Sequence, residues 1–299
     1  MSTMDTLRHG NDTTAERPVS ERASDTAPQA AVNQVAPGSE KLGRVAWVIG
    51  ASSGIGRNVA ERLAQEGMAV AASARSEDAL AELANTSDRL HSYPLDVTDE
   101  EAIAETLDAI EREIGPIDLA VFCAATWSVM DVEELEVAPI QKGMAVNFNG
   151  TVAALVPLAH RMMKRKNGRL AIVASVAGYR GLPRSVAYGP TKAALINLAE
   201  SLQPDLARHN VDVSIINPGF VDTPMTKNND FPMPFLQTVE EAGEKIVDGL
   251  KRGRYEIAFP WQLVTILKLL RRAPNSLFLW MMRKFVARSP EARAKDERN

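Results

Sequence analysis

The sequence predicts an α/β fold, in which helices cover both faces of a doubly wound parallel sheet and a helical extension follows at the C-terminus. From Gly43 to Phe259, short apolar runs alternate with longer amphipathic segments. Most of these runs are apolar without alternation, as expected for strands that are buried on both faces. A glycine cluster follows the first run directly, which is typical of the turn from a strand into a helix.

Strands and helices are expected in regular alternation. The strands are the runs at 44–50, 69–74, 90–95, 117–124, 168–175, 211–217 and 254–259. The helices are expected at 55–66, 76–84, 99–113, 139–165, 187–208 and 239–252. Elements in this order form a parallel sheet through right-handed crossovers, and such sheets bind ligands at the carboxyl ends of their strands.

The composition of the 299 residues, with 45% hydrophobic and 24% charged side chains, is that of a soluble globular protein. A net charge of −4 argues against a nucleic-acid partner, which requires a concentrated basic surface. The single cysteine, Cys123, cannot form an internal disulfide, and no leader with a cleavage site is visible, so we expect a cytoplasmic protein. His91, His160 and His209 have no partner at the spacing of metal ligands, so no metal is expected.

Residues 1–40 differ from the rest of the chain. They contain one leucine, no isoleucine and no aromatic residue, so they cannot bury enough apolar surface to offset the entropy of ordering. We expect a disordered tail. The alternative is a targeting segment, and acidic residues such as Asp5 and Glu16 argue against a transit peptide.

The first strand leads into the motif Gly-Ala-Ser-Ser-Gly-Ile-Gly at 50–56. Glycines between a strand and a helix let the backbone approach a pyrophosphate, which then faces the N-terminus of the helix. Three residues separate the first two glycines, whereas one separates them in the ordinary dinucleotide motif. The alternative is an ordinary turn, but the strand before the motif and the helix after it favour a Rossmann-like nucleotide site.

Ser175, Tyr188 and Lys192 follow one another at offsets of 13 and 4 residues. Residues four apart are neighbours on a helix surface, so Tyr188 and Lys192 are expected to lie together. A solvated helix pair would show the same spacing of four. The preceding Ser175 and the glycine motif favour a functional group of side chains.

Motifs in a shared order make the chain similar to the short-chain dehydrogenase/reductase family. They are GASSGIG at 50–56, LDV at 95–97, VNFNG at 146–150, Ser175, YGPTK at 188–192 and PGFVDTPM at 218–225, and the resemblance extends from Gly43 to Phe259. It implies a catalytic tetrad of Asn147, Ser175, Tyr188 and Lys192. It also implies that Asp96 and Val97 lie beside the adenine and that the segment from Pro218 to Thr223 borders the nicotinamide. The candidate cofactor-binding residues are Gly50, Ser52, Ser53, Gly54, Ile55, Gly56, Arg75, Asp96, Val97, Asn147, Tyr188, Lys192, Pro218, Gly219, Val221 and Thr223.

On this resemblance, residues 41–259 form a dinucleotide-binding catalytic domain, and residues 260–299 form a basic amphipathic helical extension of the same domain.

One motif departs from the family pattern. Where many members have Asn-Asn-Ala-Gly, this chain has Phe122, Cys123, Ala124 and Ala125, so the hydrogen bonds of those asparagines are not expected. Cys123 ends an apolar strand, and we interpret it as a buried thiol rather than a nucleophile.

A tyrosine beside a lysine suits carbonyl reduction, because the alkoxide that hydride transfer leaves needs a proton. A tyrosine with an ordinary pKa of about 10 is too weakly acidic to exchange protons freely near neutral pH. A cation about 4 Å away contributes roughly 4 kcal/mol at an effective dielectric of about 20, so we expect Lys192 to lower the pKa of Tyr188. Ser175 can donate a hydrogen bond to the substrate oxygen. The resemblance further implies that Lys192 holds the ribose hydroxyls and that Asn147 anchors a water linking Lys192 to solvent.

The choice of cofactor depends on the end of the second strand. An acidic residue about 20 positions after the glycines binds the ribose 2′-hydroxyl of NAD, whereas an arginine accommodates the 2′-phosphate of NADP. Here the strand ends in Ala74 and Arg75. The guanidinium of Arg75 suits a phosphate, so NADP is expected in preference to NAD. The alternative is a surface arginine at the start of the next helix.

The C-terminal region is basic and apolar. No acidic residue occurs between Glu256 and Glu291, and two helices, at 261–272 and 276–288, are expected on either side of Pro274. No apolar run reaches the roughly 20 residues that span a bilayer. Three interpretations stay open: an interfacial membrane anchor, a lid over a lipophilic substrate and a subunit contact.

The sequence therefore predicts an oxidoreductase that prefers NADP and acts on a lipophilic ketone or secondary alcohol. We expect a cytoplasmic homo-oligomer, and peripheral contact to the inner face of a membrane through the C-terminal helices is one of the three interpretations that stay open. Two alternatives from other classes are a non-catalytic dinucleotide-binding sensor and a peripheral membrane scaffold on the same fold. A sensor has no need of the complete set of Ser175, Tyr188 and Lys192.

Overall fold

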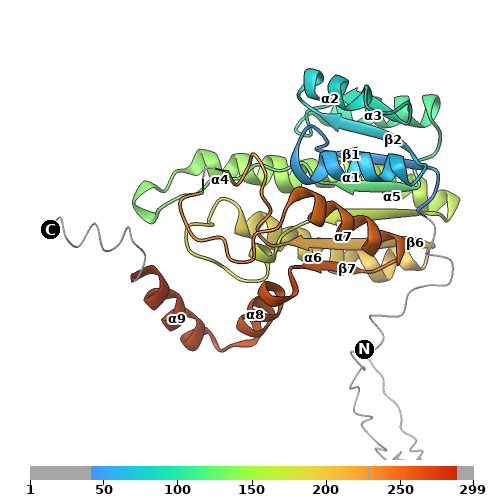
Figure 1. Cartoon of the computed structure of the whole chain (residues 1–299). Coiled ribbons are helices and arrows are strands. Elements are labelled where there is room, and N and C mark those ends of the chain that lie inside the picture. Colours follow the sequence, from blue (N-terminus) through green and yellow to red (C-terminus); the bar gives the residue numbers. More distant parts are fainter. Residues whose placement is uncertain (1–41, 228, 288–299) are drawn as a thin grey trace, which may run out of the picture. The chain divides into compact units, whose positions relative to one another are not determined.

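A single parallel sheet forms the centre of the molecule (Figure 1). The structure is a computed structural model that describes residues 42–227 and 229–287. The strands are β1 (Val45–Ile49), β2 (Ala69–Ala74), β3 (Leu90–Pro94), β4 (Leu119–Phe122), β5 (Gly168–Val173), β6 (Val211–Pro218) and β7 (Glu256–Phe259). Their order is β3-β2-β1-β4-β5-β6-β7, and every neighbouring pair is parallel. This confirms the predicted sheet, while the tail expected at 1–40 lies outside the described residues.

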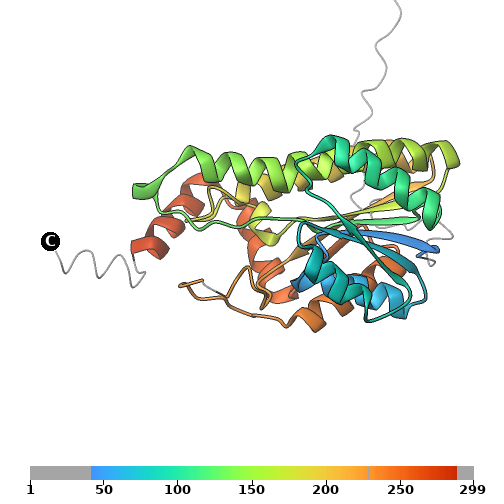
Figure 2. The same cartoon turned by 90° about the horizontal axis from the view of Figure 1, so that it is seen from above.

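Helices cover both faces of the sheet, as Figure 2 shows from above. They are α1 (Gly54–Gln65), α2 (Glu77–Ala84), α3 (Glu100–Glu113), α4 (Val137–Gly143), α5 (Gly150–Arg165), α6 (Gly189–Ala207), α7 (Val239–Lys251), α8 (Trp261–Arg272) and α9 (Asn275–Ala287). One core layer contains apolar residues of α3, α5, α6 and α8, and the other contains those of α1, α2 and α7. Successive residues of β1 alternate between the layers, so Trp47 packs in the first layer and Val48 in the second. Burial of both sheet faces explains why central strands such as β1, β4 and β5 lack polar residues at alternate positions.

The single helix expected at 139–165 is interrupted in the structure. Helix α4 begins two residues earlier, at Val137, and a π-helical turn, η3 (Met144–Asn149), separates it from α5. The turn carries the fully buried Asn147, whose side-chain amide donates to the backbone carbonyl of Thr126 at 3.0 Å and to Thr191 Oγ1 at 3.1 Å. Such turns are common at functional sites, and no residue type in this stretch signals one.

The two helices predicted in the C-terminal region form, as α8 and α9. Helix α8 buries Leu263, Val264 and Leu267 in the core. The Arg180 guanidinium donates to the carbonyls of Leu270, Arg271 and Ala273 at the end of α8 and to the side chain of Asn275 at the start of α9. The same guanidinium lies 3.9 Å from the centroid of the buried Phe278 ring. One arginine therefore satisfies the free carbonyls at the end of α8 and orients α9.

Arg180→Lys tests this anchor, because lysine keeps the charge but loses the planar fork of donors that reaches several carbonyls. Half-buried carbonyls left without a donor cost about 1–3 kcal/mol, so we expect the free energy of unfolding to fall by about that amount. Urea denaturation measures it. The control is Arg252→Lys, at an exposed pair with Asp248, where a change within about 0.5 kcal/mol is expected. Equal effects at the two positions would contradict the anchor.

Candidate active site

A cavity of about 750 Å³ lies at the carboxyl ends of the central strands. Its lining includes residues that follow β1, β2, β3, β4 and β6, together with the start of α6. Strand β1 lies between β2 and β4, and the helices that follow β1 and β4 pack on opposite faces of the sheet. This arrangement is the topological switch point at which doubly wound sheets bind their ligands.

The glycine motif forms one wall of this cavity. Gly50 has a φ of +94°, and a Cβ added there would lie 2.5 Å from the backbone nitrogen of Ala124. A Cβ on Gly56 would lie 2.1 Å from the carbonyl oxygen of Gly50. The Ser53 side chain makes no capping hydrogen bond at the start of α1, so the first N–H groups of the helix have no side-chain acceptor there. Residues 50–56 therefore fit a pyrophosphate held at a helix N-terminus.

Tyr188 and Lys192 lie together at the start of α6. The Lys192 ammonium is 5.4 Å from the centroid of the Tyr188 ring. Lys192 is only 2% exposed and donates a hydrogen bond to the carbonyl of Val173, at the end of β5, at 2.8 Å. The ring of Trp127 packs edge-on against Tyr188, with centroids 4.8 Å apart. Tyr188 and Lys192 thus lie together, as their spacing of four residues predicted. Both side chains line the cavity at the carboxyl ends of the central strands.

Burial controls the protonation of these two groups. It lowers the pKa of Lys192 to about 8. It also raises the pKa of Tyr188, with Cys123 acting in the same direction and a hydrogen bond with Ser175 lowering it. We expected Lys192 to depress the pKa of Tyr188, and the structure gives the opposite direction, because removal of the phenolate from water is the largest effect. The phenol is therefore protonated near neutral pH.

Ser175 and Asn147 lie behind the lining of the cavity. The Ser175 hydroxyl accepts a hydrogen bond from the backbone nitrogen of Ala177 at 3.1 Å and donates to the carbonyl of Pro218 at 3.4 Å. Asn147 Oδ1 accepts from the backbone nitrogen of Thr126 at 2.7 Å. Both side chains are buried. Asn147 is held by these bonds, whereas the single hydroxyl proton of Ser175 can be donated either to Pro218 or to the Tyr188 oxygen.

The structure gathers most of the predicted cofactor residues around the cavity. Those that line it are Gly50, Ser52, Ser53, Gly54, Ile55, Gly56, Arg75, Asp96, Val97, Tyr188, Lys192 and Thr223. Among the predicted residues that do not line it, Pro218, Gly219 and Val221 lie at or just after the end of β6. Arg75 is exposed in the loop between β2 and α2, and its charge is one of the causes that lower the pKa of Asp96. The larger causes are two hydrogen bonds from Thr98.

Several lining residues carry no motif that would identify them. Lys142 reaches the cavity from α4, and Ala145 does so from η3. Trp127, which was not predicted individually, is not one of the lining residues but packs against Tyr188, and its indole nitrogen donates to Asn229 Oδ1 at 3.0 Å. Cys123 lines the cavity and also packs against the core layer of α1, α2 and α7, and burial raises its pKa to about 11, which keeps it a thiol. Only three-dimensional proximity identifies these residues.

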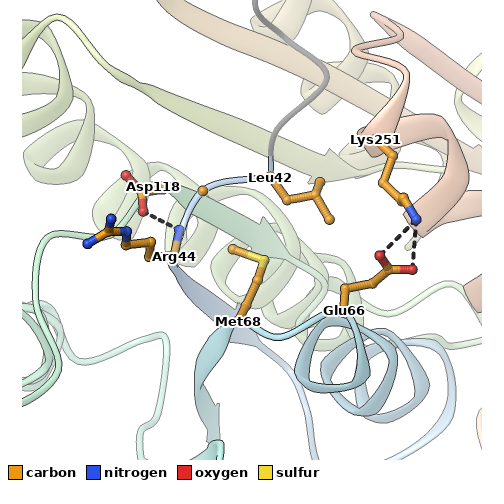
Figure 3. Close-up of a pocket in the computed structure, with 7 residues that line it drawn as sticks. Leu42, Arg44, Glu66, Met68, Asp118 and Lys251 are labelled. Carbon is orange, nitrogen blue, oxygen red and sulfur yellow. Dashed lines mark hydrogen bonds and ion pairs between the residues drawn. The ribbon is translucent and has the colours of Figure 1, made fainter.

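A second cavity, of about 520 Å³, lies at the amino ends of the strands (Figure 3). Lys251 Nζ contacts both carboxylate oxygens of Glu66, and the backbone nitrogen of Arg44 donates to Asp118 at 2.6 Å. Lys251 and Glu66 thus form an ion pair, and Asp118 accepts from the backbone of Arg44. The cavity lies at the end of the sheet opposite to the ligand site of this fold class. Within residues 42–227 and 229–287, no group of three or more His, Cys, Asp and Glu side chains is placed to hold a metal ion.

The fold and the glycine-lined cavity define a nucleotide-binding protein of the α/β class. The model of the short chain dehydrogenase family matches residues 44–232. An oxidoreductase from Myxococcus xanthus is 37% identical over 239 residues, which cover 79% of this chain and 94% of that one. The chain belongs to the short-chain dehydrogenase/reductase family, and it is an NAD(P)-dependent oxidoreductase.

Solved structures share the fold. A short-chain dehydrogenase/reductase from Burkholderia phymatum, in complex with NAD, has a TM-score of 0.70 at 22% identity and covers 76% of this chain and 92% of its own. A short-chain dehydrogenase from Sphingobium yanoikuyae, in complex with NADPH, has a TM-score of 0.68 at 21% identity, with the same coverage of 76% and 92%. The two neighbours bind different nicotinamide cofactors. Similarity of fold therefore does not determine which cofactor this chain prefers, and the preference depends on its own residues.

The lowered pKa of Lys192 predicts a pH-dependent stability. Between the folded pKa of about 8 and the ordinary value of 10.5, the unfolded chain binds a proton that the folded protein lacks. Stability therefore rises with pH through this window, and the gain is lost as the pH falls through 8. Relative to Lys192→Met, we expect the wild type to gain up to about 3 kcal/mol in free energy of unfolding across the window.

Urea denaturation at several pH values measures this difference. Lys164→Met, which removes an exposed lysine of α5, is the matched control and should show no change across the same window. A constant difference between wild type and Lys192→Met would show that burial does not control the titration of Lys192.

Proposed function

We propose that the protein transfers a hydride between NADP and a lipophilic ketone or secondary alcohol, with Tyr188 as general acid and base. The observation that carries this proposal is the position of Tyr188, Lys192 and Ser175 at one end of the glycine-lined cavity. The cofactor supplies the hydride when it is bound. The residues of the chain orient the substrate and move the proton.

Tyr188 holds the proton that carbonyl reduction requires. Burial keeps its phenol protonated, and the Ser175 hydroxyl offsets part of that effect on the pKa. Lys192, with a pKa of about 8, is largely cationic near neutral pH. A positive charge about 5 Å away contributes roughly 3 kcal/mol to a developing phenolate at an effective dielectric of about 20. This attraction acts as the proton leaves, so it stabilises the transition state more than the ground state.

Asn147 acts as a positioning residue in this proposal. Ser175 donates a hydrogen bond to the substrate oxygen, and for this its hydroxyl proton turns away from the carbonyl of Pro218. The buried Asn147 joins η3 to the loop after β4 and to Thr191 on α6, one residue before Lys192. We further propose that it orders a water that returns protons to Lys192. The candidate tetrad is therefore one connected set of groups around the start of α6.

Arg75 supports the preference for NADP. It lines the cavity next to Ala74, where a carboxylate would bind the 2′-hydroxyl of NAD. An exposed guanidinium can instead form charge-assisted bonds to a 2′-phosphate. The lipophilic substrate is supported by Met225, an exposed apolar residue that lines the cavity, and by the exposed Phe235 and Leu236 further along the same segment after β6. The cytoplasmic location and the homo-oligomer stay predictions from the sequence, as does the division at residues 41–259 and 260–299.

Arg75→Glu tests the choice of cofactor. It removes a charge-assisted contact and places a carboxylate where a phosphate is proposed, so NADP binding should weaken by at least about tenfold. NAD binding should change much less. Titration calorimetry with both nucleotides measures the two affinities. Arg89→Glu, an equal charge change near the amino ends of the strands, is the control and should leave both unchanged. Equal losses for the two nucleotides would refute the assignment of Arg75.

Tyr188→Phe tests the chemistry. The substitution keeps the ring and its packing against Trp127 but removes the transferable proton, so turnover should fall by about 10² or more. The substrate for this assay comes from a screen of ketones with NADPH, followed by loss of absorbance. NADPH affinity should be retained, which separates a catalytic defect from a binding defect. Near-normal turnover of the variant would show that the proton comes from another group, and a sensor would show no turnover in the wild type.

A further inference from the structure

Exposed apolar side chains gather at the carboxyl end of the sheet. Among the described residues, thirteen of the fourteen large exposed hydrophobic side chains lie on α8, on α9 or on the segments that follow β4, β5 and β6. The exception is Val156 on α5. Single exposed apolar residues are normal on a protein surface, but a concentration at one end of the molecule marks an interaction site.

Helix α8 is apolar on both its inner and its outer face. Leu263, Val264 and Leu267 are buried in the core. Ile266 and Leu269 are exposed, and Trp261 is 73% exposed. A helix that only covers the sheet would carry polar residues at these outward positions. The outer face of α8 is therefore suited to an apolar environment.

Helix α9 repeats this arrangement. Phe278 is buried beneath the Arg180 guanidinium, while Leu277, Leu279 and Trp280 are exposed. The ammonium of Lys284 lies 4.1 Å from the centroid of the Trp280 ring. Figures 1 and 2 show both helices at the end of the sheet where the loops of the cavity lie. The contacts of Arg180 hold α9 in this position.

The charge of this surface has one sign. Arg271, Arg272, Arg283 and Lys284 are exposed, and the sequence has no acidic residue between Glu256 and Glu291. The whole chain has a net charge of −4, so the basic character is local. Tryptophan, leucine and basic side chains on one helical surface are the composition of helices that lie in a lipid interface.

Other occupants fit these observations less well. A lid over the substrate would line the cavity, but none of its lining residues in the described chain comes from α8 or α9. A symmetric contact with a second copy would place the four exposed cations of one copy against the same four of the other, without an acid from either helix pair. Phosphate groups of lipids neutralise such a surface.

We propose that α8 and α9 form a peripheral binding surface for a bilayer that contains anionic phospholipids. We define the α8–α9 surface by Trp261, Ile266, Leu269, Leu277, Leu279 and Trp280, together with the four exposed basic residues above. The apolar side chains enter the headgroup region, and the cations pair with phosphates. In the described residues, no helix has the length and hydropathy to cross a bilayer, so the contact is interfacial.

Vesicle co-sedimentation of the full chain tests the electrostatic part. We expect binding to vesicles of phosphatidylcholine with phosphatidylglycerol, much weaker binding to phosphatidylcholine alone, and weaker binding in high salt. Arg283→Gln with Lys284→Gln should lower the partition coefficient by roughly thirtyfold. Lys164→Gln with Arg208→Gln removes the same charge at exposed positions near the amino ends of β5 and β6, and it should have little effect. Equal losses for the two double variants would overturn the proposal, since net charge alone would then explain binding.

Trp280→Ala tests the apolar part. Its loss of partition should persist in high salt, because burial of the indole is not screened. Sedimentation velocity without lipid tests whether the α8–α9 surface instead binds a second copy of the chain. If Trp280→Ala dissociates an oligomer while the wild type ignores anionic vesicles, the surface is a subunit contact and the proposal is wrong. The measurement needs no substrate, so its outcome is independent of the proposed reaction.

Discussion

The close approach of the loops after β1 and β4 is the constraint on which the nucleotide cavity depends. The two strands are neighbours in the sheet, but the helices that follow them pack on opposite faces. At this divergence the backbone of Gly50 passes so near to Ala124 that no side chain fits between them. Gly56 then lets α1 begin against the carbonyl of Gly50, which directs its N-terminus into the cavity. The strand order therefore requires glycine at these positions, and the same geometry creates the candidate phosphate site at the N-terminus of α1.

A second constraint is the burial of the Lys192 ammonium between β5 and α6. The ammonium donates a hydrogen bond to the carbonyl of Val173. Burial and the Cys123 thiol are the causes that shift the pKa of Lys192, and no carboxylate is among them. A buried cation without a carboxylate lowers stability, and such groups concentrate at functional sites. The same burial raises the pKa of Tyr188, so the dry site opposes ionisation of both groups. The reacting groups gain strong mutual interaction at low dielectric, at a cost in folding free energy.

The sheet was predictable because the central strands β1, β4 and β5 are buried on both faces and most helices are amphipathic, so local patterns and the final packing agree. The glycines, Tyr188 and Lys192 were predictable for a similar reason. Their relative positions depend on residues a few places away in the sequence, so a short motif is enough to identify them. The π-helical turn at Asn147 was not, because it results from contacts with Thr126 and Thr191, which lie far away in the sequence. The positions of Lys142 at the cavity and of Trp127 beside Tyr188 were not predicted either, because they also depend on contacts between segments that lie far apart in the sequence. The direction of the Tyr188 pKa shift was also predicted wrongly, because the charge of Lys192 alone does not include the desolvation of the phenolate, whose size depends on burial.

The C-terminal extension and the candidate tetrad share one loop, and this gives the α8–α9 surface a physical connection to the cavity. Tyr179 follows Ser175 in that loop, and its hydroxyl donates to Glu256 at 2.6 Å, while Lys268 of α8 pairs with the same carboxylate. The next residue, Arg180, holds the junction of α8 and α9. Leu263 of α8 lies against Gly219, directly after the end of β6. The helices therefore contact the segments that carry Ser175 and Pro218 but leave the cavity uncovered. A surface built in this way can bind lipid while the mouth of the cavity stays open at the same end of the sheet.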